Sequence, residues 1–352
     1  EGIATSSANN VAVGRQALQG AGTRSNNTAI GMAALYSSTT GANNVAVGYR
    51  AGYANTTAGE NTAIGYSSMT TNTTGANNTA IGFSSFALNT TGAGNTALGR
   101  YALYNNTTAA DNTAVGNSCL QNNTTGASNI GVGTGALFSN TEGAGNVAIG
   151  HNTLDANTTA SNITAVGYAA LSANTTGASN TAVGQGALQV NTTGATNSAL
   201  GNSAGVAITT GSNNCLLGTS AGSNITTGGA NIMIGFNTTV AAVGDVHEIV
   251  MGYAMVGKGA STGFISPNSG PMYNGQNSTV WVATSDRRIK KDIVPNTKGL
   301  AAINQIEPMN FYYKSDEELQ EELPGAKEYL PLNKLTTSAI AQELDLIFPE
   351  AI

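Results

Sequence analysis

Residues 77–116 read "NNTAIGFSSFALNTTGAGNTALGRYALYNNTTAADNTAVG", which is one short phrase written three times. The phrase aligns on its glycine, and from Gly14 to Gly252 a glycine recurs every 17 residues, fifteen times without an insertion. We call these the register glycines. Val, Ile, Leu or Met precedes each one, and Asn lies four residues before thirteen of the fifteen. Such a strict period predicts a solenoid, in which each repeat is one coil that buries its apolar residues against its neighbours.

The repeated phrase also predicts the outline of one coil. Alternation along a strand puts Thr79 and Ile81 on one face and Ala80 on the other. A second short apolar segment follows, such as Ala102-Leu103, and then a polar corner, Asn-Thr-Thr-Gly-Ala, where Gly and Asn accept a left-handed backbone. We therefore expect a mainly β fold with two short strands and two turns per coil, and coils about 4.8 Å apart.

Both faces of the repeated strand carry apolar side chains. One face fills the thin interior of the coil, and the other presents Val, Ile or Leu to the outside in every repeat. An uninterrupted apolar row of this length is unusual on a monomer, so we expect chains to associate around a common axis. The asparagines four residues before the glycines are expected to stack into a ladder of amides along the rod.

The phrases "NTAIG" (78–82) and "NVAVG" (10–14), repeated on a short fixed period, resemble the head repeats of YadA-like trimeric adhesins. The resemblance covers residues 5–252. It implies a homotrimer in which each chain forms a left-handed β-roll. The 17-residue period is longer than that family's typical repeat, with the extra residues in the Asn-Thr-Thr-Gly corner.

Composition excludes several classes of function. Only 9% of the 352 residues are charged and 6% are aromatic, unlike an ordinary globular enzyme. The net charge of -6 argues against a nucleic-acid partner or an anionic membrane surface, because both need clustered Lys and Arg. No signal peptide and no apolar run long enough to cross a bilayer are present, so we expect no membrane insertion. Any secretion signal would lie upstream of Glu1.

Motifs for a metal or a cofactor are weak in this sequence, and we expect neither. Cys119 and Cys215 stand where other repeats carry small residues, which predicts small buried hydrophobic side chains and no disulfide. His151 and His247 are far apart, without a carboxylate and cysteine cluster nearby. The glycines of "GVGTG" (131–135) superficially resemble a phosphate-binding loop, but Gly133 is a register glycine and no strand-loop-helix unit surrounds it.

Two alternative functions depend on the polar residues of the repeats. A glycosylated surface filament without a receptor would use the corner sequons, although turn chemistry alone explains them. A glycan-degrading tailspike enzyme would need paired carboxylates in a cleft. The repeats offer only a few scattered acidic residues for that purpose. The corner sequons include Asn72, Asn89, Asn106, Asn123, Asn157, Asn174 and Asn191, and the acidic residues include Asp111, Glu142, Asp155 and Asp245.

The composition of the sequence changes near residue 253, where the 17-residue repeats end. All seven prolines lie at or after Pro267. We expect three parts: the solenoid over 1–252, a β-rich neck over 253–284, and a small α+β domain over 285–352. Helical patterns at 300–306 and 341–348 and an aromatic strand at 309–314 support the α+β assignment.

The C-terminal phrases "SDRRIKKDIVPNTKGLAAINQIEPMNFYYK" (285–314) and "SAIAQELDLIFPEAI" (338–352) resemble the intramolecular chaperone of phage endosialidase tailspikes and related tail fibres. In that family the domain trimerises, assists folding of a β-helical stalk, and then cuts itself off. The resemblance implies that Ser285 is the nucleophile, that Lys290 is its general base, and that the cut falls between Thr284 and Ser285.

This chemistry is reasonable for the residues present. A serine hydroxyl needs a base, and a lysine serves as one when burial or neighbouring cations lower its pKa. Arg287, Arg288 and Lys291 supply such cations. The alternative is that Ser285 caps a basic turn and that Lys290 is solvated.

The sequence as a whole predicts a structural fibre or adhesin shaft, extracellular on a virion tail or a cell surface. Its expected partners are two further copies of the chain and a host-surface glycan or protein receptor. Near-identical coils offer many registers, so a C-terminal trimer is expected to align the chains. Beyond self-cleavage we expect no enzymatic activity on external substrates.

Overall fold

The structure is a computed structural model that describes residues 8–266, 272–274, 282–283, 309–311 and 336–338. The chain falls into two compact units, Glu1–Asp286 and Arg287–Ile352. Each unit is described by itself. Within the described residues all regular secondary structure is β-strand.

The repeats of the first unit each contribute one short strand. Adjacent strands pair in parallel with a constant offset of 17 residues, as in the pairs Thr79 with Thr96 and Ala80 with Ala97. The 17-residue coil predicted from the glycines is thereby confirmed. The strands are β1 (Val11–Val13), β2 (Thr28–Ile30), β3 (Val45–Val47), β4 (Thr62–Ile64), β5 (Thr79–Ile81), β6 (Thr96–Leu98), β7 (Thr113–Val115), β8 (Ile130–Val132), β9 (Val147–Ile149), β10 (Thr164–Val166), β11 (Thr181–Val183), β12 (Ser198–Leu200), β13 (Cys215–Leu217), β14 (Ile232–Ile234) and β15 (Ile249–Gly252).

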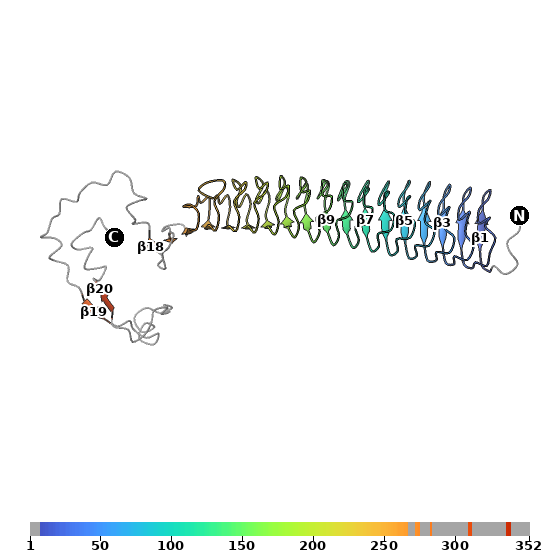
Figure 1. Ribbon diagram of the computed structural model, residues 1–352, viewed down its shortest axis with the longest axis horizontal. Coiled ribbons are helices and arrows are strands. Elements are labelled where there is room, and N and C mark those ends of the chain that lie inside the picture. Colours follow the sequence, from blue (N-terminus) through green and yellow to red (C-terminus); the bar gives the residue numbers. More distant parts are fainter. Residues whose placement is uncertain (1–7, 267–271, 275–281, 284–308, 312–335, 339–352) are drawn as a thin grey trace, which may run out of the picture. The chain divides into compact units, whose positions relative to one another are not determined.

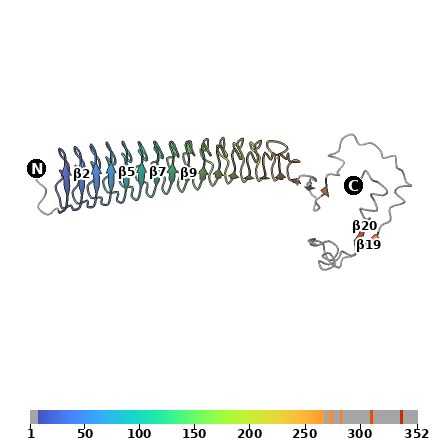
Figure 2. The same cartoon turned by 180° about the vertical axis from the view of Figure 1, so that it is seen from behind.

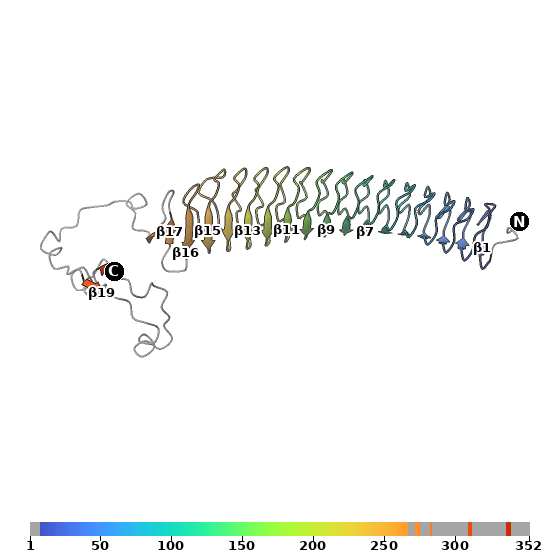
Figure 3. The ribbon, with the colours of Figure 1, turned by 60° about the horizontal axis from the view of Figure 1, so that its bottom comes forward.

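The coils stack in a single row, and their strands lie side by side along one face (Figures 1 and 3). The same row is seen from behind in Figure 2. With about 4.8 Å between parallel neighbours, the fifteen strands from β1 to β15 span about 70 Å.

Parallel stacking continues past the last register glycine, but with a shorter coil. Strand β16 (Gly263–Ser266) pairs with β15, and Val250 faces Phe264, an offset of 14 residues. Two antiparallel strands follow, β17 (Met272–Asn274) and β18 (Val282–Ala283). In the second unit β19 (Met309–Phe311) pairs antiparallel with β20 (Thr336–Ser338). The expected strand at 309–314 is thus present in part, and the expected helices at 300–306 and 341–348 lie outside the described residues.

The second strand expected in each coil does not form. The segment after the register glycine is a series of turns in which the second and fourth residues adopt positive φ, as in Ser84 (48°) and Phe86 (51°). This alternation still points backbone groups at both neighbouring coils: Ser84 donates to Tyr66, and Phe86 donates to the carbonyl of Ala102. The segment keeps the hydrogen bonds between coils without an extended backbone. The short apolar segment was therefore wrongly predicted to be a strand.

The register glycines are required by backbone conformation and by contact between coils. Gly184 has φ of +140°, which L side chains rarely adopt. A Cβ built on Gly184 would lie 2.3 Å from the carbonyl oxygen of Gly201 in the next coil. The column therefore has no room for a side chain.

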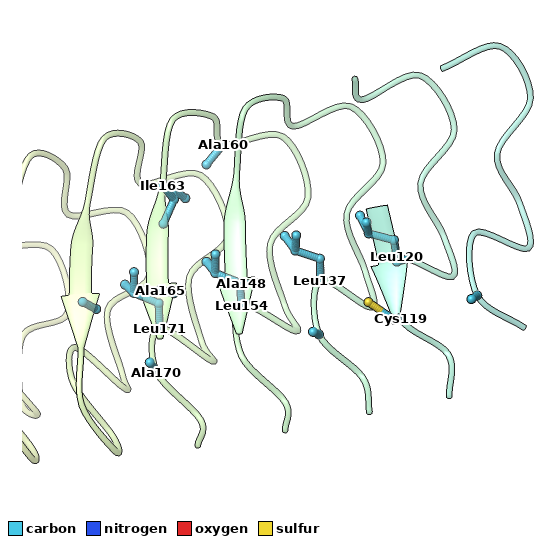
Figure 4. Close-up of a cluster of buried hydrophobic side chains, with 14 of the residues drawn as sticks. Cys119, Leu120, Leu137, Ala148, Leu154, Ala160, Ile163, Ala165, Ala170 and Leu171 are labelled. Carbon is cyan, nitrogen blue, oxygen red and sulfur yellow. The ribbon is translucent and has the colours of Figure 1, made fainter. Parts of the chain in front are cut away.

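The core of each coil is thin and consists mainly of two small residues, one of them the alanine of the strand, and one larger residue. The alanine column, two residues before the register glycines, points inward from the strand, as in Ala148 and Ala165. Opposite it lie leucines four residues after the glycines, such as Leu137, Leu154 and Leu171 (Figure 4). The predicted orientation of alanine inward and the aliphatic residues outward is confirmed by the burial of strands such as β5 and β9, whereas Ala12 in the first strand is exposed.

Where a coil departs from this pattern, a neighbouring coil compensates for the change in volume. Gly131 stands in the alanine column, and a Cβ there would meet the sulfur of Cys119 at 2.5 Å. Leu216 also stands in the alanine column, and its methyl groups occupy the space that a Cβ on Gly205 or Gly222 would need. Large and small residues are thus matched between adjacent coils, as close packing requires.

Enlarging the alanine column without compensation should destabilise the solenoid. Replacing Ala148 by leucine is expected to cost about 1–3 kcal/mol of unfolding free energy per chain, because the site is filled by Leu137 and Leu154. Adding Leu154→Gly should recover part of this loss, since glycine accepts the positive φ of Leu154 (53°). Denaturant unfolding measures both changes. Ala242→Leu, at an exposed residue, is the control, and an unchanged midpoint for Ala148→Leu would contradict the packing.

Candidate functional site

The outer face of the parallel sheet is the most extensive surface feature of the described solenoid. It is formed by the residues one and three before each register glycine. We call the residues one before the glycines the aliphatic column, since all are Val, Ile, Leu or Met. In the column three before the glycines, Thr is the commonest residue.

The aliphatic column is exposed or half-buried along its whole length in the isolated chain. Val13 and Leu200 are more than half exposed, at 56% and 51%. Single exposed aliphatic side chains are ordinary, but fifteen in one line form a contiguous apolar strip. A strip of this kind marks an interaction surface.

The two cysteines have different environments. Cys119 is fully buried, and burial raises the pKa of its thiol to about 12. Cys215 is exposed, because it lies three residues before a register glycine and so points outward from β13. The expectation of a buried hydrophobic residue is correct for Cys119 and wrong for Cys215.

The asparagine column, four residues before the register glycines, forms the expected ladder. Where asparagines follow one another in the column, the backbone N–H of one donates to the Oδ1 of the preceding one, as from Asn146 to Asn129 at 3.0 Å. Ile163 interrupts the ladder, because its N–H donates to Asn146 but its side chain offers no acceptor to Asn180. The side-chain amide in turn donates to a carbonyl of the next coil, as from Asn129 to Gly143 at 2.8 Å. The side chains are buried, so these bonds satisfy groups that water does not reach.

A second amide ladder runs along the corner. We call it the corner asparagine column, seven residues after the register glycines. From Asn89 to Asn191 the Nδ2 donates to the Oδ1 of the preceding asparagine, and most also donate to a carbonyl of their own corner, as from Asn123 to Asn106 (3.0 Å) and to Gly126 (2.8 Å). Turn chemistry alone was expected for these residues, and the ladder was not. The signal for it in the sequence is an asparagine repeated at the coil spacing.

The corner ladder bears directly on glycosylation. The seven corner sequons named above place their asparagine in this column, where each side chain is fully buried. A glycan on Nδ2 would remove a ladder donor and would have no path to solvent from the folded coil. The geometry of the described solenoid therefore argues against glycosylation at these seven asparagines.

Glu248 occupies the asparagine column at its C-terminal end and is fully buried. Its Oε1 accepts from the N–H of Gly259 at 2.8 Å, and its Oε2 accepts from the N–H of Ala241 at 3.3 Å. Burial raises the pKa of this carboxyl above its ordinary value, although the N–H donors oppose the rise. Glu248 thus ends the ladder by binding the shorter coil that follows.

Removing one ladder amide should be costly. Asn129→Ala would leave the N–H of Asn146 and the carbonyl of Gly143 without their side-chain partner. We expect a loss of about 1–3 kcal/mol of unfolding free energy for each group. Thr125→Ala, at an exposed corner residue, is the control and should change little. Thermal unfolding followed by circular dichroism measures both, and equal midpoints for the two variants would contradict the role of the ladder.

Two acidic residues interact at the C-terminal end of the described solenoid. After burial, the charge of Asp245 adds to the rise in the pKa of the Glu248 carboxyl. Asp245 accepts from the N–H of Ala242 at 2.7 Å, and the oxygens of Glu248 are bonded as described above. Among the described residues no group of three or more His, Cys, Asp or Glu side chains is placed to hold a metal ion. The carboxylates of Asp245 and Glu248 both accept backbone hydrogen bonds at the C-terminal end of the solenoid.

Ser285 and Lys290, the predicted nucleophile and base, lie outside the described residues, as does the predicted cut before Ser285. Their pairing remains a prediction from the sequence. In the parts of the chain that the structure covers, no helix has the length and apolar character needed to cross a bilayer.

Comparison with known proteins identifies the C-terminal region. Residues 285–352 match the family described as the chaperone of endosialidase. No curated protein and no solved structure is significantly similar to the chain. The chain therefore combines a β-solenoid with a C-terminal chaperone-of-endosialidase domain, and its likeness to YadA-type repeats stays an expectation.

Proposed function

We propose that this chain is one subunit of a homotrimeric extracellular fibre, the shaft of a phage tail fibre or tailspike. Three solenoids stand parallel and turn the aliphatic column toward a common axis. The C-terminal domain trimerises first and sets the three chains in register. The observation that carries the proposal is the aliphatic column, an apolar strip that runs the whole length of the solenoid.

The C-terminal family match supports both the trimeric assembly and the location of the fibre on a phage tail. Chaperone-of-endosialidase domains belong to phage tail proteins and imply trimeric assembly, and residues 285–352 match that family. A solenoid of near-identical coils also needs such a domain, because a slip by one coil keeps most contacts between chains. Tethering three chains at one end raises the effective concentration of matching coils.

The remaining functions follow from the position of the shaft. A host-surface glycan or protein is the proposed receptor of the fibre. The C-terminal domain is proposed to cut itself off between Thr284 and Ser285, with Ser285 as nucleophile and Lys290 as base. An adhesin on a cell surface would share the same solenoid, and the family match is what favours the phage tail.

The two native cysteines provide a test of the proposed face. In an isolated chain Cys215 is exposed and Cys119 is buried. In the proposed trimer Cys215 lies on the face turned to the axis, so both thiols should resist a maleimide under native conditions. A cysteine at Thr125, an exposed corner residue, should react quickly as the positive control.

The particle mass must be measured on the same sample by light scattering. We expect three chains per particle with Cys215 protected. Trimers in which Cys215 reacts as fast as the corner cysteine would place the interface elsewhere. Folded monomers with reactive Cys215 would contradict the trimer itself.

A further inference from the structure

The residue that follows each register glycine varies in type from coil to coil. These residues form a third outward-facing column, which we call the post-glycine column, and all fifteen are exposed in the chain. The aliphatic column is uniform from end to end. The post-glycine column is not, because it alternates between groups of rings and groups of polar side chains.

Rings occur in three groups. The first is Tyr49, Tyr66 and Phe83, whose centroids are 5.0 and 5.2 Å apart with interplanar angles of 18° and 7°. The second is His151 on Tyr168 at 5.6 Å, and the third is Phe236 on Tyr253 at 5.1 Å. The spacing follows the rise of the coil, about 4.8 Å, so each group is a stack along the rod.

Polar side chains separate these ring groups. Asn117 and Thr134 lie between the first and second groups. Gln185, Asn202 and Thr219 lie between the second and third. Arg100 ends the first group, with its guanidinium 6.0 Å from the ring of Phe83 and 4.3 Å from that of Tyr101. The ring groups therefore have different lengths and unequal separations.

Stacking limits which parts of these rings remain accessible to a binding partner. A sugar binds an aromatic residue through the ring face, and in each group the neighbouring ring covers at least one face of every ring. The ring edges remain accessible, and edges pack well against other rings or aliphatic groups. The column is also continuous with the aliphatic column across one register glycine. Both features favour a second copy of this chain over a glycan.

We propose that the post-glycine column fixes the register of the shaft by matching itself between chains. This inference rests on the proposed parallel trimer. We call the height of one coil along the trimer axis a level. When the chains are in register, symmetry places the same residue of each chain at one level, so rings face rings and polar groups face polar groups. A slip by one coil would oppose Phe83 to Arg100, Thr134 to His151 and Tyr168 to Gln185. The same slip would leave aliphatic side chains facing each other in the aliphatic column, so that column does not distinguish the two registers.

The test exchanges two polar levels with two ring levels without changing composition. The swapped chain carries Asn117→His, Thr134→Tyr, His151→Asn and Tyr168→Thr. Its homotrimer matches itself at every level and should melt close to wild type. Co-expression of the two chains with different affinity tags gives mixed trimers, in which four levels oppose rings to polar groups. These mixed trimers are expected to melt below both homotrimers.

A control exchange uses residues five after the register glycines, away from the post-glycine column. Gln121→Phe with Phe138→Gln moves one ring by one coil, and mixed trimers with wild type should melt like their parents. Mixed trimers of the fourfold swap that melt between the two homotrimers would overturn the inference. Monomeric wild type would instead contradict the trimer. If the fourfold variant does not fold, Thr134→His with His151→Thr poses the same test at two levels.

Discussion

Replacing Gly184 by alanine is expected to break the solenoid at one coil. The new Cβ would lie 2.3 Å from the carbonyl oxygen of Gly201, and φ at this residue is +140°. Backbone strain should cost about 1–3 kcal/mol, and displacement of the next coil about 1–3 kcal/mol more. Because stability in a stack of repeats is a sum over neighbouring coils, the damage should be local. Hydrogen exchange should show lost protection around Gly184 and Gly201.

Gly186 offers a control two residues away in the same coil. Its φ is +63°, and the nearest atoms to an added Cβ are 3.5 Å or more away. Ser203 and Ser220 hold the equivalent places in the next two coils with φ of 54° and 55°. Gly186→Ser should therefore cost at most about 1–2 kcal/mol. Equal melting temperatures for Gly184→Ala and Gly186→Ser would show that coil contact does not select the register glycines.

Ser285→Ala is expected to abolish self-cleavage of the chain. In the proposed reaction the hydroxyl of Ser285 attacks the carbonyl carbon of Thr284 and gives its proton to Lys290. The peptide C–N bond then breaks to leave an ester and a free amine on Ser285. Water hydrolyses the ester and leaves a carboxylate on Thr284. Wild type should yield a fragment that begins at Ser285 without added protease.

Lys290→Ala should slow this cleavage strongly, because the hydroxyl loses its base. Both variants should still trimerise, since alignment of the chains depends on the fold of the domain. Ser278→Ala, a serine seven residues upstream, is the control and should cleave normally. Denaturing gels with N-terminal sequencing decide the outcome. A wild-type chain that stays intact, or a fragment that starts elsewhere, would leave the domain as a trimer clamp without proteolysis.

The sequence predicted the solenoid because its physics is local and repeated. The register glycines, the inward Ala148 and the outward Ile149 follow from a period of 17 and an alternation of two. Cys119 and Cys215 show the limit of the method. The two residues differ in their distance from a register glycine, and burial followed that distance instead of residue type.

Two parts of the fold could not be read from the period. The second strand of each coil fails because residues such as Leu103 adopt positive φ, which side-chain polarity does not reveal. The parallel pairing of Val250 with Phe264 uses a shorter coil, where no glycine repeats at the old spacing. For Ser285 and Lys290 the sequence supplies the chemistry, and the described residues supply no geometry.

The volume matching between neighbouring coils limits how such a shaft can change its length in evolution. Coils with the ordinary alanine and leucine are interchangeable, so recombination that removes or duplicates one of them leaves every contact filled. The seam between Cys119 and Gly131 differs, because a breakpoint there would leave one coil with a void and another with a steric clash. The coils around Leu216, Gly205 and Gly222 form a second indivisible block. Lengthening and shortening should therefore concentrate at the uniform seams, and the two matched blocks should be inherited whole.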